Sequence, residues 1–447
     1  MWSARPVEGF FRRLRWAADG ILIAILLVIP WVEINGEPLI RLDVPGRKFH
    51  VFGLVIFPQE LYFLWLIVAG LALALFFFTA LAGRLWCGWA CPQTVLTDVY
   101  AMVGRWIQGW SRSGPPARVA AWRKIATHVV WMCFAALLGF HLVGYFVSPY
   151  ALLSKAASGA LTPTTTRFLL ASTALAYLDL ALVRQTFCKY LCPYARFQSV
   201  LFDRDTLVVG YDTKRGEPRG KRGSVVGDCV DCGLCVAVCP TGIDIRNGLQ
   251  LECIACTQCI DACNAVMERL ERPRNLIGYR SLVALERVRA VRILRPRVLM
   301  YGALLSAIVV AFVAAVVARE PLDLQVAHNP SLLFGSAADG RTSNAFILHI
   351  QNRDREDHDY RIRLEAPRGF ELVTGVNPVR VQATSAFETR VFVLAEQDGE
   401  DSAHRAVTSG ESKLGFVLER TDDPRQRVVR DITFLFAAGS SGGGSVH

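Results

Sequence analysis

Eight cysteines near the middle of the chain have the spacing of iron–sulfur ligands. Residues 227–264 contain two C-x2-C-x2-C-x3-C runs, at Cys229, Cys232, Cys235 and Cys239 and at Cys253, Cys256, Cys259 and Cys263. In bacterial ferredoxins such runs hold two 4Fe–4S clusters, and the fourth cysteine of each run ligates the other cluster. We therefore predict two clusters with crossed ligand sets: the first on Cys229, Cys232, Cys235 and Cys263, and the second on Cys253, Cys256, Cys259 and Cys239.

Zinc is the alternative occupant of these thiolates, because tetrahedral sulfur sites also suit that ion. A doubled run with a three-residue final interval is far more specific than a lone C-x-x-C, so it favours iron. Pro240 follows the first run, whereas Asn264 takes the corresponding place after the second. Proline is not a ligand, so we expect the second run to bind its cluster despite this departure.

Four further cysteines form two C-x3-C-P motifs, which end at Pro92 and Pro193. The motif cysteines are Cys87, Cys91, Cys188 and Cys192. On a helix this interval puts both sulfurs on one face, about one turn apart, and the proline disfavours continuing the helix through the second cysteine. Each pair is therefore expected at a helix end near the membrane surface.

Several kinds of chemistry suit these motif cysteines. Arg84 and Lys189 lie close in sequence and would favour thiolates. Soft thiolates at low coordination suit Cu(I). A copper site, a redox dithiol and a contact to the clusters are the functional interpretations, and ordinary buried cysteines at helix ends are the structural alternative.

Weaker candidates lie inside apolar segments. His128 is level with the cysteine pairs and is a secondary candidate for a copper ligand, whereas His141 lies nearer the other end of the same segment. Asp179 is an intramembrane carboxylate, which is costly and often functional. A proton or metal role for Asp179 therefore competes with interhelical hydrogen bonding. Cys133 is expected to be a packed core thiol.

Five apolar segments precede or follow these motifs and are predicted to span a membrane. They cover approximately residues 17–32, 61–82, 125–147, 168–183 and 298–318. The clearest has the length that a hydrocarbon core of about 30 Å requires. A cleaved signal peptide is the alternative for the first segment. No small-residue cleavage site follows it, so we predict a retained span.

The distribution of charge predicts which segments share a side of the membrane. The chain has a net charge of +10; residues 319–447 hold 15 Lys and Arg and 19 Asp and Glu, a balance of −4, so residues 1–318 carry +14. Basic charge beside apolar spans indicates a cytoplasmic membrane flank rather than a nucleic-acid footprint. The N-terminus, the loop 84–124 and the region 184–297 are therefore placed in the cytoplasm. This puts the clusters in a reducing compartment and the cysteine-free C-terminal part outside.

The predicted fold is a membrane protein with about five transmembrane helices, a cytoplasmic two-cluster ferredoxin-like α+β insert and a C-terminal all-β sandwich. Short alternating runs separated by turn residues predict the sandwich over residues 319–436. The predicted domains are a four-helix membrane domain with both C-x3-C-P motifs (1–202), the two-cluster domain (203–290), the fifth helix (291–318), the periplasmic sandwich (319–437) and a flexible tail (438–447).

The chain resembles the cytochrome c oxidase accessory proteins of the CcoG/FixG type. The resemblance rests on WCGWACPQTV after the second span, FCKYLCPYARFQ after the fourth and YDTKRGEPRG before the clusters. NapH-type membrane ferredoxin proteins are similar through the motifs and clusters but do not carry the long C-terminal β-domain. The CcoG/FixG resemblance implies an Ig-like C-terminal domain, a place in the bacterial inner membrane, and reduction of Cu(II) to Cu(I) during assembly of cbb3-type oxidase.

The sequence and the resemblance together predict a membrane-bound iron–sulfur cupric reductase. An unidentified cytosolic donor would reduce the clusters, and copper held by the four motif cysteines would be reduced and passed to copper-delivery proteins. One alternative is a quinol-linked electron-transfer subunit of NapH type, with His128 or Asp179 handling protons. A second is a non-enzymatic oxidase assembly scaffold. The expected partners are oxidase assembly and copper-delivery proteins and the lipid membrane, without nucleic acid.

Overall fold

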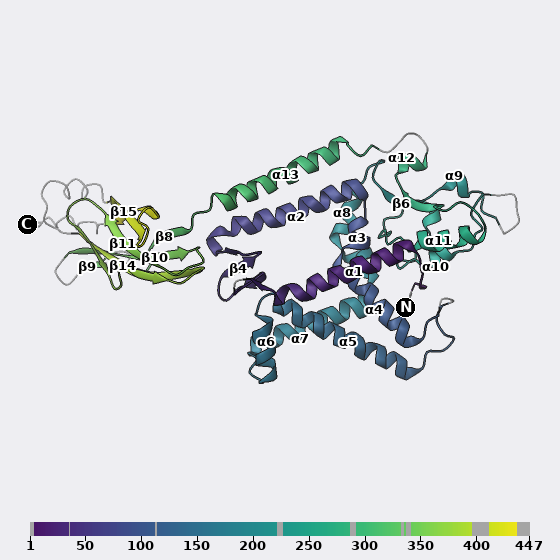
Figure 1. Cartoon of the computed structure of the whole chain (residues 1–447), viewed down its shortest axis with the longest axis horizontal. Helices are drawn as coiled ribbons and strands as arrows, with labels where there is room; N and C mark the ends of the chain where they lie inside the picture. The colour runs from purple at the N-terminus through teal and green to yellow at the C-terminus, as the bar shows by residue number, and fades with distance from the viewer. Residues whose placement is uncertain are drawn as a thin grey trace, which may run out of the picture. The chain divides into compact units, whose positions relative to one another are not determined.

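The computed structural model describes residues 4–34, 36–111, 114–220, 227–286, 292–331, 335–336, 341–395 and 411–435. The chain divides into two compact units, Met1–Ala315 and Val316–His447 (Figure 1). The first unit contains the helices and the cluster-binding part, and the second is built of strands. Each unit is described by itself.

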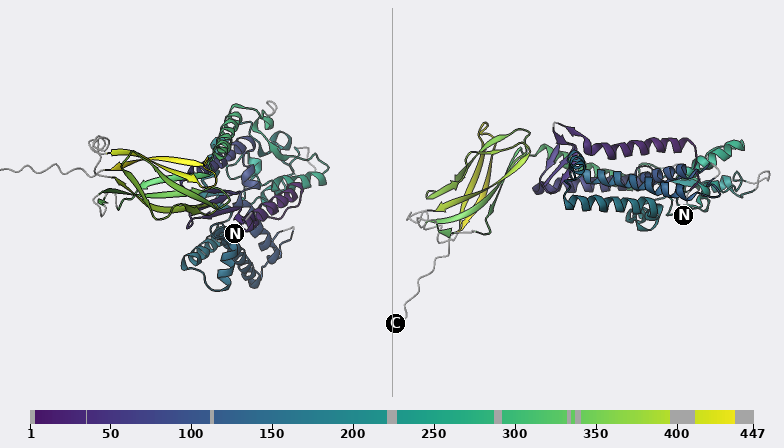
Figure 2. Two further views of the ribbon diagram at one scale, coloured as in Figure 1. Left: turned by 60° about the vertical axis from the view of Figure 1, so that its left-hand side comes forward. Right: turned by 90° about the horizontal axis from the view of Figure 1, so that it is seen from below.

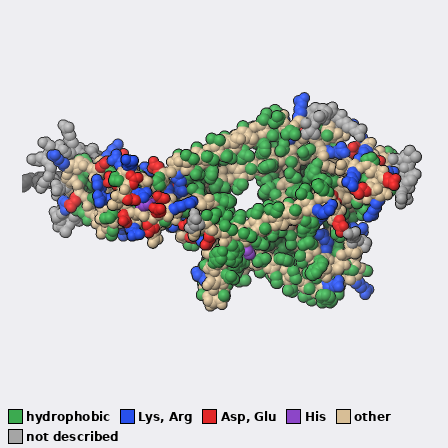
Figure 3. Space-filling view, viewed as in Figure 1, with side chains coloured by type: hydrophobic (Ala, Val, Ile, Leu, Met, Phe, Trp, Pro, Cys, Tyr) green, Lys and Arg blue, Asp and Glu red, His purple; other side chains and the backbone are tan. Residues whose placement is uncertain are grey.

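Within the described residues, five helical segments are long and apolar enough to cross a membrane: Phe10–Trp31, Pro58–Ala82, Ala121–Gly144, Pro163–Val183 and Pro296–Val317. They contain α1 (Phe10–Val28), α2 (Leu61–Ala82), α5 (Ala121–Gly144), α7 (Pro163–Tyr177) and α13 (Pro296–Val317). These helices lie lengthwise beside one another in the first unit (Figure 2). Hydrophobic side chains cover their outer faces, whereas charged side chains gather over the cluster-binding part (Figure 3). A hydrophobic exterior of this extent suits lipid and confirms a multi-pass membrane protein with the five predicted spans.

Helix α1 begins at Phe10, well before the predicted start near residue 17. The Asp261 carboxylate accepts hydrogen bonds from the backbone N–H groups of Phe11 at 3.2 Å and Arg12 at 2.7 Å, which satisfies the first turn of the helix. Arg12 and Arg15 are buried against Asp98. The prediction was wrong at this end because it treated the arginines as flanking residues, whereas an internal carboxylate allows the helix to carry them.

The segment between α1 and α2 forms short antiparallel strands. These are β1 (Glu33–Ile34), β2 (Glu37–Pro38), β3 (Ile40–Asp43), β4 (Lys48–Val51) and β5 (Leu54–Ile56). Strands β3, β4 and β5 form one sheet in that order. Together with α6 (Pro149–Ala157), they lie at the end of the helices that is remote from the cluster-binding part (Figure 1).

The cluster-binding part is a small α+β fold. Strand β6 (Val208–Tyr211) pairs antiparallel with β7 (Ile277–Arg280). Between them lie α9 (Thr213–Gly216), α10 (Leu234–Ala237), a 3-10 turn (Ile245–Asn247) and α11 (Gln258–Arg269), and α12 (Leu282–Leu285) follows. The buried core of this part includes Val209, Ile260, Met267 and Ile277, and the cluster cysteines pack against it.

The three basic segments that were predicted to share a side lie at the same end of the helices. The backbone N–H of Arg5 donates to Ala237 O at 3.0 Å, and Arg105 Nη1 donates to Ala4 O at 3.3 Å. At the start of α13, Arg295 forms an ion pair with Asp203 at 2.8 Å. These contacts hold the N-terminus, the loop after α2 and the cluster-binding part together. That this end faces the cytoplasm stays a prediction.

The second unit is an antiparallel sandwich of two sheets. The first sheet has the strand order β12 (Phe370–Thr374), β14 (Ser385–Ala395), β10 (Thr342–Asn352), β8 (Leu322–His328), and β9 (Gly335–Ser336) also pairs with β10. The second sheet has the strand order β13 (Val379–Val381), β11 (His358–Glu365), β15 (Glu411–Arg420), β16 (Arg427–Leu435). Alternate side chains meet between the sheets, including Leu324, Phe346, Ile362, Val391 and Phe416. The predicted β-sandwich is confirmed, and the predicted tail 438–447 lies outside the described residues.

Candidate metal centres

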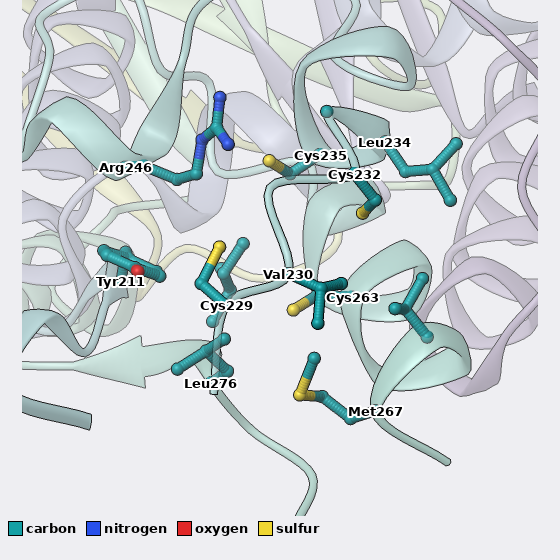
Figure 4. A pocket seen from close by; sticks show the side chains of 13 residues that line it. Tyr211, Cys229, Val230, Cys232, Leu234, Cys235, Arg246, Cys263, Met267 and Leu276 are labelled. Atoms are coloured by element: carbon teal, nitrogen blue, oxygen red, sulfur yellow. The ribbon is translucent and has the colours of Figure 1, made fainter. Parts of the chain in front are cut away.

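The first set of predicted cluster cysteines surrounds one cavity. It has about 360 Å³ of empty space and is lined by Cys229, Cys232, Cys235 and Cys263. Figure 4 shows their sulfurs around a common space, with Tyr211, Arg246 and Met267 at its margin. Cys263 comes from α11, whereas the other three come from the first loop, so the crossed ligand set is spatially possible. That these sulfurs bind a cluster stays a prediction.

The second predicted set surrounds another cavity, with about 350 Å³ of empty space. Its lining includes Cys239, Cys253, Cys256 and Cys259. Burial raises the pKa of Cys253 to about 11 and that of Cys256 to about 12, and it raises the pKa of Cys259 well above its ordinary value. Such thiols keep their protons in the absence of metal, so loading of this cavity must release protons.

Both cluster loops are shaped by the same backbone turns. In the first loop, Asp231 and Gly233 have φ values of 50° and 65°, on either side of Cys232. In the second, Ala255 and Thr257 have φ values of 53° and 64° at the equivalent positions. Left-handed residues before and after the middle cysteine bend each loop so that its sulfurs surround a cavity. Repetition of this uncommon geometry accounts for the doubled spacing in the sequence.

The arrangement of these sulfurs suits a cluster better than a zinc ion. Across the described part of the chain, no three His, Cys, Asp or Glu side chains are gathered closely enough to hold one metal ion. Each predicted set of four sulfurs instead lines one cavity. A set of four thiolates suits a 4Fe–4S cube, which when bound supplies one-electron redox chemistry.

The two C-x3-C-P motifs have matching local structures. After α2, Gly83 has φ 56° and ψ −122°, and the short helix α3 (Leu85–Trp89) carries Cys87. After the fourth span, Arg184 has φ 55° and ψ −131°, and a π-helical turn (Phe187–Leu191) carries Cys188. In each copy, a left-handed residue ends the span and turns the chain into the motif.

The second cysteine of each motif ends its short helix, as the proline predicts. Cys91 is extended, with φ −68° and ψ 123°, and α4 (Pro92–Gln108) begins at the next residue. Cys192 is also extended, with φ −71° and ψ 112°, before α8 (Pro193–Leu201). Because proline lacks a backbone N–H, it is well tolerated at the first position of the new helix.

Thiols of the two C-x3-C-P motifs lie within electrostatic reach of one another. Burial raises the pKa of Cys87 to about 11, and the charges of Cys91 and Cys192 add to this effect. Burial raises the pKa of Cys188 to about 12, and the charges of Cys91, Cys87 and Cys192 add to it. The two motifs therefore bring their cysteines into one region of the fold.

Gln198 on α8 contributes to this site and was not singled out from the sequence. Its side chain is 0% exposed, and Nε2 donates a hydrogen bond to the Cys87 sulfur at 3.4 Å. A buried amide beside a thiol holds the sulfur in place and stabilises its charged form. The only sequence signal was a polar residue on the short helix that follows the second motif.

Asp179 anchors the first motif to the fourth span. Gln93 Nε2 donates to Asp179 Oδ1 at 3.1 Å and to the Arg184 carbonyl at 3.1 Å. Of the two predicted roles for Asp179, this geometry supports interhelical hydrogen bonding. The first motif is thus fastened to the helix that carries the second.

The two histidines are engaged elsewhere. His128 Nδ1 shares a hydrogen bond with the Tyr177 hydroxyl at 2.9 Å, and its ring packs edge-on against Trp131. His141 Nε2 accepts from Trp31 Nε1 at 3.2 Å, and its Nδ1 lies 2.8 Å from the Leu137 carbonyl. Neither set of contacts supports metal ligation.

Cys133, which was expected to be packed in the core, is exposed on α5. The expectation failed because an apolar thiol inside a span can face lipid at little cost. Its exposure also distinguishes it from the four motif cysteines, which are half-buried.

A buried charge network joins α1 to α4 and was also missed. Asp98 pairs with Arg12 at 2.5 Å and with Arg15 at 3.0 Å. Asp19 is 1% exposed, and its carboxylate oxygens have no hydrogen-bond partner among the described residues. The spacing of Arg12, Arg15 and Asp19 places them on one helical face, which was a detectable signal inside an apolar segment.

Profiles of known families match three regions of the chain. Residues 183–282 match a "4Fe-4S dicluster domain", residues 62–111 a "4Fe-4S binding domain", and residues 312–437 the "IG-like fold at C-terminal of FixG". The predicted Ig-like domain is thereby confirmed, and two 4Fe–4S binding domains are present.

Several curated proteins are similar to the chain. Protein RdxA of Cereibacter sphaeroides is 37% identical over 431 residues, which cover 90% of this chain and 91% of that protein. Nitrogen fixation protein FixG of Rhizobium meliloti is 31% identical over 447 residues, covering 86% and 85%. Ferredoxin-type protein NapH of Haemophilus influenzae is 24% identical over 209 residues, covering 44% and 66%. The chain therefore belongs to the FixG family and is a multi-pass membrane iron–sulfur redox protein.

Proposed function

We propose that this protein reduces Cu(II) to Cu(I) at the site formed by Cys87, Cys91, Cys188 and Cys192, for assembly of a cbb3-type cytochrome c oxidase. The observation that carries the proposal is that the half-buried thiols of the two motifs lie within electrostatic reach of one another, at the same end of the helices as the cluster-binding part. Copper is the substrate here. A cytosolic one-electron donor and the oxidase copper-delivery proteins are the proposed partners.

The chemistry of the site suits this substrate. Sulfur ligands favour Cu(I) over Cu(II) because they are soft, so binding at this site makes copper easier to reduce. The reaction adds one electron to Cu(II), and a reduced 4Fe–4S centre gives up one electron. Burial raises the pKa values of Cys87, Cys91 and Cys188, so these thiols hold their protons in the absence of metal and copper binding releases protons to solvent. Gln198 keeps the Cys87 sulfur in place during this exchange.

The quinone-linked alternative has less support in the site. It requires His128 or Asp179 to carry protons, yet their hydrogen bonds to Tyr177 and Gln93 give both side chains a structural role. The NapH-type relatives match less than half of this chain. The scaffold alternative assigns no chemistry to the four half-buried motif thiols.

The test is anaerobic stopped-flow on dithionite-reduced, detergent-purified protein. Cu(II) is added, recovery of the oxidised-cluster absorbance is followed, and a Cu(I) chelator reports the product. The variant replaces all four motif cysteines by serine, and Cys133→Ser, which changes an exposed thiol on α5, is the matched control. Fast reoxidation is expected in the wild type and the control, and slow reoxidation in the four-serine variant.

Two other results would contradict copper reduction at the motif cysteines. Equal rates in the four-serine variant would mean that copper only strips electrons from accessible clusters. Faster, cysteine-independent reoxidation by a quinone analogue would assign the quinone-linked function instead. A chain lacking residues 319–447 should keep reductase activity, whereas a scaffold would lose its partner.

A further inference from the structure

The first C-x3-C-P motif rests directly on the loop of the second cluster cavity. Gly88 lies between Cys87 and Cys91 and is buried. A Cβ atom at this position would lie 2.5 Å from the Ala255 carbonyl oxygen and 2.6 Å from the Ile254 carbonyl oxygen. These distances are far below van der Waals contact, so the two backbones can approach this closely only because residue 88 has no side chain.

The loop that receives Gly88 carries ligands of the second cavity. Ile254 and Ala255 lie between Cys253 and Cys256, and both cysteines line that cavity. The backbone of the motif therefore touches the peptide segment that joins two predicted cluster ligands.

Neighbouring side chains fasten this contact on both sides. Trp89 Nε1 donates a hydrogen bond to the Tyr279 hydroxyl at 3.0 Å, and that hydroxyl donates to the Ala255 carbonyl at 3.4 Å. Arg15 Nη1 reaches the Cys256 carbonyl at 3.5 Å. Hydrogen bonds therefore connect the first motif, the cluster loop and α1 at this contact.

The second motif and the first cavity differ at the corresponding points. Lys189 stands where Gly88 stands in the first motif, and a side chain there prevents the same close approach of backbones. In the first cavity, Cys232 is exposed. The two cavities therefore differ. The second cavity adjoins the first C-x3-C-P motif, whereas the first cavity has an exposed cysteine.

We propose that Gly88 is a positioning residue: it seats the first C-x3-C-P motif on the loop of the second cavity, so that a 4Fe–4S centre held by Cys239, Cys253, Cys256 and Cys259 would be the immediate one-electron donor to Cu(II) bound at the motif thiols. The cavity with the exposed Cys232 is then the point at which electrons enter from an external one-electron carrier. The centre held in the second cavity would supply one electron and Cu(II) would take it up, with no bond broken in the protein. The identity of the acceptor rests on the proposed function, whereas the order of the two cavities does not.

The first experiment compares Gly88→Ala and Gly88→Val with Gly20→Ala in the reduced holoprotein. Gly20 is a helical glycine on α1 with no neighbour within 4 Å, so it is the matched control. The added Cβ displaces the Ile254–Ala255 segment. We expect altered EPR line shape and midpoint potential for one of the two clusters, with the other cluster unchanged. Cu(II)-driven reoxidation should slow by about tenfold or more, because a misplacement of about 1 Å can cost about 10²-fold in rate.

Tyr279→Phe provides a variant that adds no volume. It removes the hydroxyl that links Trp89 to Ala255, so it should perturb the same EPR signal as the Gly88 variants but by less. Iron analysis verifies that both clusters are present in each protein. Unchanged EPR spectra and rates in all three variants would overturn the proposal, even if copper reduction itself is established.

The second experiment removes one ligand set at a time, with Cys232→Ser and Cys256→Ser, and reduces each protein chemically. With the first cluster perturbed, thiol-dependent reoxidation by Cu(II) should stay fast; with the second perturbed, it should be lost. The opposite pattern would reverse the assigned order. If the wild type shows no thiol-dependent copper reduction, the proposed function fails, and the Gly88 EPR result still decides the positioning role.

Discussion

A single carboxylate, Asp98, neutralises two arginines that α1 carries into the protein. Arg12 and Arg15 are 8% and 2% exposed, and Asp98 is 6% exposed. Arg12 also lies over the Trp16 ring, 4.5 Å from its centroid. Charges this far from water are tolerated because each has a partner at hydrogen-bond distance. The network therefore couples the first helix to the helix that follows the first motif.

Asp98→Asn should destabilise the first unit strongly. It leaves two buried guanidinium groups without a counter-charge, and breaking a buried pair typically costs about 3–5 kcal/mol. The matched control is Glu268→Gln, which breaks an exposed ion pair with Arg274 and should cost less than about 1 kcal/mol. Thermal unfolding in detergent measures both. Equal, small shifts for the two variants would show that water reaches the Asp98 network.

The same network determines a pH dependence. Burial acts to raise the pKa of Asp98, but Arg15 and Arg12 together lower it more, so its pKa lies below the ordinary value. A carboxyl of this kind stabilises the fold above its unfolded pKa, and the contribution is lost as pH falls through the folded pKa. The difference in melting temperature between wild type and Asp98→Asn should therefore be constant between about pH 8 and pH 5 and should shrink below the unfolded pKa of about 3.9. A difference that shrinks as pH rises would contradict this sign.

At the residue level, the sequence predicted the cysteines but not the residues that hold them in place. The cysteine spacing is a local pattern, so all twelve candidate ligands could be named from it. Gln198 and Gly88 matter because of what lies opposite them, at Cys87 and at Ala255, more than 100 residues away in the chain. Contacts between residues so far apart depend on the folded structure, so no local sequence pattern predicts them.

At the scale of elements, the turn after α2 and the turn after the fourth span have the same backbone geometry but different residues. Gly83 and Arg184 have nearly the same backbone angles, although left-handed geometry favours glycine. Arg184 is held there by its surroundings, with its guanidinium 5.9 Å from the centroid of the Trp131 ring. A side chain is tolerated at one turn because it has space and a partner.

Gly83→Ala should destabilise the turn after α2. Its φ of 56° is unfavourable for alanine, and a Cβ would lie 2.8 Å from the Leu207 carbonyl oxygen. A loss of about 1–3 kcal/mol in unfolding free energy is expected. Gly20→Ala, in an open helical position, should cause no loss, because alanine suits a helix better than glycine does. Denaturant titration of both variants in one detergent checks the contrast.

The elements were predictable where one property decides them. Hydropathy alone located the spans because lipid requires long apolar helices. The start of α1 was misplaced because Asp98 and Asp261 change the cost of carrying arginines. The strands of residues 33–56 have no strong signal in the sequence because they are very short and pair only with one another.

At the scale of the whole molecule, the cysteines and the β-sandwich lie in different compact units. The first unit holds all the cysteines, and the second is a sandwich whose core is aliphatic and aromatic. The two-part organisation was predictable because composition changes sharply after the fifth span. The sidedness rests on charge alone and stays a prediction.

Removing iron should affect the two units differently. The core of the cluster-binding part includes Cys229 and Cys235, and four more predicted ligand cysteines pack against it, so its stability depends on the occupied cavities. Oxidation with a chelator should lower the unfolding temperature of the first unit and leave that of the sandwich unchanged, as calorimetry of the treated and untreated protein would show. A common shift of both transitions would contradict independent units.

The hydrogen bonds from the first turn of α1 to Asp261 have a consequence for biosynthesis. The ribosome makes α1 first, whereas Asp261 emerges about 250 residues later. The first span must therefore enter the bilayer with its opening turn incomplete. That turn is finished only when the cluster loops have been made and folded. The first helix to be synthesised is therefore completed only after the second cluster loop has folded. In a chain that fails to acquire its clusters, the first turn of α1 would lack this partner and would be open to proteolysis.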